Sequence, residues 1–99
     1  MQIIPIQSAP NQTLTVTLDG QTCQIDIYVT FFGIFVDLYV SNTLIIGGVQ
    51  ALNLNRIVRD DYLGFSGDLA FIDTQGTSDP EESGLGGRYI LAYLSASEL

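Results

Sequence analysis

Residues 12–30 read QTLTVTLDGQTCQIDIYVT, and apolar residues occupy every second position on both sides of an Asp-Gly pair. Because successive side chains of a strand point to opposite faces, this alternation is typical of strands that bury one face. Asp19-Gly20 suits a tight two-residue hairpin turn, since both of its residues adopt positive φ readily. The stretch therefore predicts a β-hairpin with strands over Gln12–Asp19 and about Thr22–Thr30.

Further short strands follow along the chain. Four segments have the composition of such strands: Ile34–Val40, Leu44–Ile46, Asp68–Thr74 and Arg88–Leu94. Ser41-Asn42-Thr43 reads as a turn, and Gly47-Gly48 suits a bulge or sharp bend where the preceding strand ends. Val49–Tyr62 fits neither the strand period nor the helix period, which leaves open a strand or a single helical turn.

These segments predict an all-β fold. With about 6–7 short strands and turn signals at close spacing, residues 1–99 are expected to form a small, single-domain antiparallel β-barrel or sandwich. A long Gly- and acid-rich loop precedes the last strand. The second face of Ile34–Val40, with Phe35, Asp37 and Tyr39, is amphipathic rather than polar, so something is expected to cover it.

Composition narrows the range of functions. The chain has 3 basic and 11 acidic residues, no His and a single Cys, and its formal net charge is −8. Three arginines are too few to neutralise the phosphates of a nucleic-acid backbone, which disfavours double-stranded nucleic acid as a partner. Without His, zinc sites and Ser-His-Asp or Cys-His catalysis are excluded within this chain. The sequence therefore predicts no enzyme, no metal and no cofactor, with Cys23 as a small buried hydrophobe.

The N-terminal segment Met1–Pro5 has no basic region followed by a long apolar stretch, so it is not expected to act as a signal peptide. Apolar runs elsewhere stop well short of the ~20 residues that a membrane-spanning helix needs. The protein is therefore expected to be made in the cytoplasm, without a membrane span.

Gln75–Gly87 is the candidate contact loop, with four Gly, one Pro and three acidic residues. Leu85 is its only large apolar residue, and ordering each backbone residue costs about 1–2 kcal/mol. The loop is therefore expected to be mobile in the free protein and ordered on assembly. In that state Leu85 would anchor it, and Asp79, Glu81 and Glu82 would face basic neighbours.

Two further pairs of residues are candidates for an interface. Arg56 and Arg59 are scarce cations in an acidic chain, and the planar guanidinium suits ion pairs at interfaces. Either they pair with Asp60-Asp61 within the chain or they bond to another chain. Phe31-Phe32 at a solvent-facing tip would provide a protein-docking patch or a platform for stacking a sugar.

Seven short motifs carry a resemblance to a known family: Ile4–Gln7, Pro10–Leu14, Asp37–Val40, Tyr62–Leu69, Asp79-Pro80, Gly84–Gly86 and Arg88–Tyr93. In their order and spacing they resemble the baseplate plug family of contractile-tailed bacteriophages, including cyanophages. The resemblance spans nearly the whole chain. It implies a small β-structured protein of the tail tip, built into the baseplate near its central hub, with no enzymatic activity and no catalytic residues.

The resemblance also implies a location and partners. The protein would be a structural virion component of the tail baseplate, made in the host cytoplasm and present in multiple copies in a symmetric assembly. It would contact other baseplate and tail proteins (hub, wedge and tube-proximal chains) and no nucleic acid. The alternative is a small β-fold binding module of a tail tip that recognises a glycan or receptor. Such a module would bind a soluble ligand as an isolated monomer, whereas a plug needs other baseplate chains.

Overall fold

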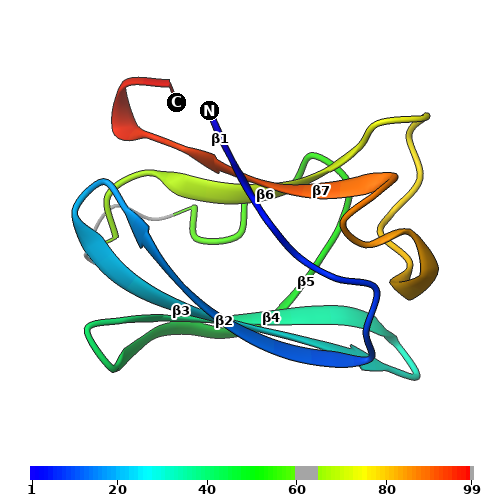
Figure 1. The fold of residues 1–99 in the computed structure, drawn as a ribbon, viewed down its shortest axis with the longest axis horizontal. Coiled ribbons are helices and arrows are strands. Elements are labelled where there is room, and N and C mark those ends of the chain that lie inside the picture. The colour runs from blue at the N-terminus through cyan, green and yellow to red at the C-terminus, as the bar shows by residue number, and fades with distance from the viewer. Residues whose placement is uncertain (60–64, 99) are drawn as a thin grey trace.

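The computed structural model describes residues 1–59 and 65–98, which form two antiparallel β-sheets that face each other (Figure 1). The four-stranded sheet has the order β2-β3-β4-β5. Its strands are β2 (Asn11–Leu18), β3 (Gln21–Thr30), β4 (Gly33–Val40) and β5 (Thr43–Gln50). The three-stranded sheet has the order β1-β7-β6. Its strands are β1 (Gln2–Ile4), β6 (Asp68–Asp73) and β7 (Tyr89–Leu94).

The prediction of an all-β fold is confirmed. Of the two predicted forms the structure adopts the sandwich, because the strands within the described part of the chain form two sheets and no closed barrel. Two single-turn 3-10 helices, η2 (Glu82–Gly84) and η3 (Ala96–Glu98), lie outside the sheets.

The turns of the four-stranded sheet follow the local sequence. Asp19 and Gly20 connect β2 to β3 with φ of 51° and 76°, and Ser41 and Asn42 connect β4 to β5 with φ of 50° and 67°. Two consecutive residues with positive φ give the turn whose twist matches the flanking strands. Both predicted turns are confirmed.

Two elements differ from the prediction. The strand expected to end at Gly47-Gly48 continues to Gln50, because the glycines form a bulge after which Val49 pairs with Val36 of β4. The pairing of β1 with β7 was not predicted, since three residues are too few to show an alternation.

The segment 51–59 runs alongside β6 and does not form a helical turn. Isolated bridges join Asn53 to Phe71 and Arg56 to Ala70, and the backbone N–H of Ile57 donates to the carbonyl oxygen of Leu69 at 2.9 Å. The remainder of the ambiguous stretch, residues 60–62, lies outside the described residues.

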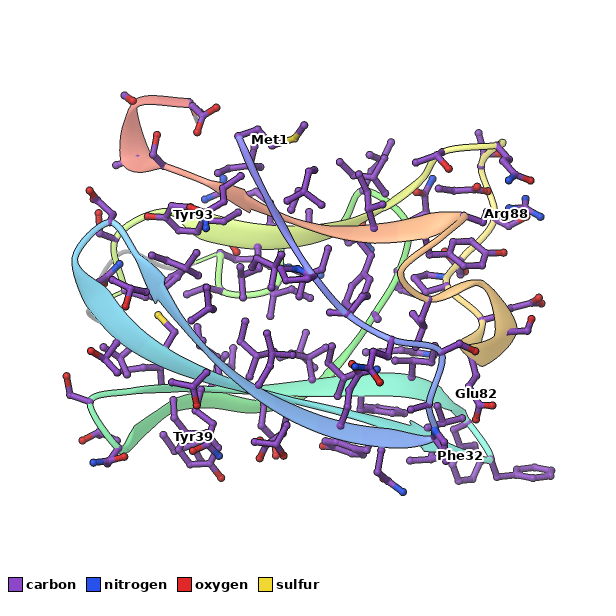
Figure 2. All side chains as sticks on the ribbon, viewed as in Figure 1. Met1, Phe32, Tyr39, Glu82, Arg88 and Tyr93 are labelled. Atoms are coloured by element: carbon purple, nitrogen blue, oxygen red, sulfur yellow. The ribbon has the colours of Figure 1, made fainter. Side chains whose placement is uncertain are left out.

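The core lies between the sheets, where side chains from the facing sides of both layers meet (Figure 2). Members that are almost fully buried include Leu18, Cys23, Ile25, Ile27, Val36 and Leu38 from one sheet, and Leu69, Phe71, Tyr89 and Leu91 from the other. The prediction that Cys23 is buried is confirmed, and burial raises the pKa of its thiol. The alternating pattern thus places one face of the four-stranded sheet in the core and leaves the other face outside.

Candidate functional site

Two buried aspartates, one at each end of β6, hold the segments on which several candidate residues lie. Asp68 is 0% exposed. Its Oδ2 accepts from Arg56 Nε at 3.0 Å and from the backbone N–H of Arg59 at 2.8 Å. Its Oδ1 accepts from the backbone N–H groups of Val58 at 2.8 Å and Leu69 at 2.7 Å. The carboxylate therefore ties the segment 51–59 to the start of β6.

Asp73 plays the same part at the other end of β6. Its two oxygens accept from Arg88 Nε at 2.8 Å and Nη2 at 2.9 Å, a bidentate pair. They also accept from the backbone N–H groups of Gln75 at 2.9 Å and Ser78 at 2.8 Å. The hydrogen-bonded Arg88 guanidinium holds the pKa of Asp73 well below its usual range, and the backbone donors act in the same direction.

The contacts of Asp68 show where the two interface candidates Arg56 and Arg59 lie. Arg56 pairs with Asp68, and the Arg59 side chain donates from Nε to the carbonyl oxygen of Arg56 at 2.7 Å. The carboxylates suggested as their partners, Asp60 and Asp61, lie outside the described residues. A contact of Arg56 or Arg59 with another chain stays a prediction.

The expectation that Leu85 anchors the loop to another protein is wrong, because Leu85 is 4% exposed and belongs to the core of its own chain. Pro80 is buried as well, so the loop has more apolar surface to bury than Leu85 alone. Gly86 has a φ of +82° and donates its N–H to the carbonyl oxygen of Tyr89 at 2.9 Å. A Cβ at Gly86 would clash with the carbonyl oxygen of Ile6. The close approach that glycine permits here is thus made by the N-terminal segment of the same chain.

The acidic residues of the loop have different surroundings. Asp79 is exposed, and its Oδ1 accepts from the backbone N–H of Asn53 at 2.9 Å. Glu81 is exposed just before η2, and half-buried Glu82 begins that helix. The carbonyl oxygen of Glu82 accepts from Ser8 Oγ at 2.9 Å. The loop is therefore fastened to the N-terminal segment and to the segment 51–59.

Phe31 and Phe32 form the turn between β3 and β4, and their side chains are 98% and 78% exposed. The rings lie edge to face with centroids 5.5 Å apart. Thr30 Oγ1 accepts from the backbone N–H of Phe32 at 3.1 Å, and Gln50 Nε2 donates to the Phe32 carbonyl oxygen at 3.1 Å. Polar contacts thus hold the backbone of the turn while two large apolar rings face solvent. We call this pair the phenylalanine tip.

The phenylalanine tip and the acidic loop lie at the same end of the sandwich. Near the end of β3, the backbone N–H of Val29 donates to the carbonyl oxygen of Pro10 at 2.8 Å, and Ser8, two residues before Pro10, holds Glu82. Figure 2 shows Phe32 and Glu82 at this end. The Arg56 pair lies at the start of β6, toward the other end. The structure therefore brings together the aromatic and acidic candidates but not the arginines.

Sequence reasoning missed two exposed leucines, Leu44 on β5 and Leu54 in the segment 51–59, which are 52% and 64% exposed. Leu44 begins the apolar run Leu44–Ile46, and Leu54 lies between two asparagines in the stretch that fits neither the strand nor the helix period, so the local pattern does not show that either side chain is exposed. Within residues 1–59 and 65–98, no group of three His, Cys, Asp or Glu side chains is arranged to hold a metal ion. None of the helices in these same ranges is long and apolar enough to cross a membrane.

Comparison with known proteins gives one result that covers nearly the whole chain. A protein-family model described as "Cyanophage baseplate Pam3 plug gp18" matches residues 1–96. A comparison with curated proteins found no match. The matched range includes every strand that the structure describes, together with Asp68 and Asp73, so the family extends over the entire sandwich.

Proposed function

The chain belongs to the cyanophage baseplate plug family, and from this premise we propose that it is a structural part of a contractile tail baseplate that acts through protein–protein contacts and not by catalysis. The match over residues 1–96 carries the proposal. The partners would be neighbouring hub, wedge or tube-proximal chains, contacted by several copies of the protein in a symmetric assembly.

The phenylalanine tip supports a docking role. Phe31 and Phe32 expose two large rings on a turn that Thr30 and Gln50 hold in place. Contact of these rings with water is unfavourable, and full burial of one Phe side chain lowers the free energy by about 1.5–3 kcal/mol. Two aromatic rings on a fixed backbone are suited to insertion into an apolar pocket of a neighbour, because little conformational entropy is lost on binding.

The double variant Phe31→Ser/Phe32→Ser tests the proposal in phage particles that carry it in place of the wild-type chain. Since neither ring is in the core, we expect the isolated variant to unfold at the wild-type urea concentration. Its copy number in purified tails, measured by quantitative mass spectrometry, should fall at least about tenfold, because two apolar anchors are lost.

Leu54→Ser is the matched control, since it removes an exposed apolar side chain from a different surface. It should enter tails at the wild-type level. If the wild-type chain itself is absent from purified baseplates, the structural role is refuted. If the wild-type chain is present and the double variant enters normally, the docking role of the tip is refuted.

A further inference from the structure

Two aspartates face each other on the solvent side of the four-stranded sheet. Asp26 of β3 and Asp37 of β4 are direct partners in the antiparallel register. Side chains of such a pair have Cβ atoms about 4.5–5.5 Å apart, and like charges in this position destabilise the sheet. Neither residue is in the core, because their neighbours along each strand, Ile25 and Leu38, point inward. A repulsive pair at the centre of a sheet face requires an explanation.

In the part of the chain that the structure describes, the hydrogen bonds of the aspartate pair use only one oxygen of each carboxylate, Oδ1. Asp37 Oδ1 accepts from Tyr28 Oη at 3.0 Å and from the backbone N–H of Gly48 at 2.7 Å. Asp26 Oδ1 accepts from Gln24 Nε2 at 3.1 Å. Across the described ranges, no arginine pairs with either carboxylate. Arg56 and Arg88 pair with Asp68 and Asp73, and the Arg59 side chain donates to the Arg56 carbonyl oxygen, so the negative charge on this face is not balanced from within the described structure.

Apolar and aromatic side chains flank the aspartate pair on both sides. Toward the phenylalanine tip, Tyr28 stacks on Phe35 with centroids 6.1 Å apart and an interplanar angle of 18°. Toward the other end of the sheet, Tyr39 is the register partner of the exposed Leu44. The face thus carries aromatic side chains on both sides of a charged centre, borders the outward-facing threonines of β2, and continues into the turn that carries the phenylalanine tip. Partial burial raises the pKa of the Tyr28 phenol, and Asp37 and Asp26 add to the effect.

We propose that a basic segment of a neighbouring protein covers this face and places an arginine between Asp26 and Asp37, with apolar side chains packed on the flanking aromatic rings. The inference rests on the proposed function and names the chemistry of the partner. Arginine suits the position because its planar guanidinium bonds two carboxylates at once and stacks on aromatic rings. A second copy of the chain is a poor occupant, since each copy carries a net charge of −8.

The double variant Asp26→Asn/Asp37→Asn separates stability from assembly. Each asparagine keeps one side-chain oxygen to accept the existing hydrogen bonds, while the repulsion disappears. The urea midpoint of the isolated variant should therefore equal or exceed that of the wild-type chain. Its copy number in purified tails should fall at least about tenfold, because the partner's cation loses both opposite charges.

Asp19→Asn is the control for loss of charge. Asp19 lies in the turn between β2 and β3, away from the aspartate pair, and asparagine tolerates its φ of 51°. This variant should enter tails normally. A lower urea midpoint for Asp26→Asn/Asp37→Asn would mean that the chain's own contacts balance the pair, and normal entry of that variant into tails would mean that no cation docks there. Either result overturns the inference and leaves the baseplate role intact, whereas absence of the wild-type chain from tails refutes the role itself.

A charge reversal identifies the occupant. Phage carrying Asp37→Arg should assemble poorly, and suppressor mutations that restore growth can be selected. Changes of Arg or Lys to Asp or Glu in another baseplate protein would support the proposal. Suppressors confined to this chain would indicate that a second copy covers the face and would overturn it.

Discussion

The carboxylate of Asp68 should matter far more to stability than the arginine that pairs with it. Asp68 is fully buried and accepts four hydrogen bonds, of which three come from backbone N–H groups and one from Arg56. Asp68→Asn keeps the shape of the side chain and one of its two acceptor oxygens. The other oxygen becomes an NH₂ group, so two N–H donors lose their acceptor and face another donor, either the buried pair from Val58 and Leu69 or the half-buried pair from Arg56 and Arg59.

The magnitude follows from these contacts. A buried donor without a partner costs about 1–3 kcal/mol, so two donors without an acceptor cost about 2–6 kcal/mol. We expect Asp68→Asn to lower the free energy of unfolding by about 3–5 kcal/mol. For a domain whose total is about 5–15 kcal/mol, that loss is severe. Arg56→Met should cost only about 1 kcal/mol, because the Arg56 side chain is 43% exposed and three backbone donors remain on Asp68.

Urea denaturation of the purified chain, followed by far-ultraviolet circular dichroism, measures both variants. The slope of free energy against urea should be unchanged, so the difference appears in the midpoint. If Arg56→Met costs as much as Asp68→Asn, the ion pair and not the backbone amides holds the segment 51–59. A cost below about 1 kcal/mol for Asp68→Asn would refute the reasoning altogether.

Two further predictions concern the loop that precedes β7. Because the pKa of Asp73 in the folded chain lies below its ordinary value of 3.8, its contribution to stability is complete above that value and is lost as the pH falls below it; urea midpoints measured from pH 6 to pH 2.5 should therefore drop less steeply in Asp73→Asn than in the wild-type chain. Gly86→Ala should destabilise by more than about 2 kcal/mol, because positive φ and a clash with the Ile6 carbonyl act together. Gly20→Ala, at a similar φ of +76° with nothing within 4 Å of the new Cβ, should cost only about 1 kcal/mol in the same urea titration.

Local sequence was sufficient to predict the β2–β3 hairpin and both tight turns of the four-stranded sheet. Whether a pair such as Asp19-Gly20 or Ser41-Asn42 turns the chain depends on the φ preferences of those two residues, which no distant segment alters. The alternation in residues 12–30 then assigned each side chain to the core or to the outer face. A composition without His, and with three arginines in a chain of net charge −8, is enough by itself to narrow the range of functions.

The candidate site depended on contacts that local sequence does not contain. That Arg56 would pair with Asp68, 12 residues away, depends on how the segment 51–59 runs along β6. Leu85 looked available to a partner because its own loop is polar, but the core that buries it is supplied by other parts of the chain. The register of β3 against β4 is what sets Asp26 opposite Asp37. The geometry of a turn and the alternation of side chains between faces depend on residues a few positions apart in the sequence. The neutralisation of a charge and the burial of a side chain depend on which distant segments pack beside that residue.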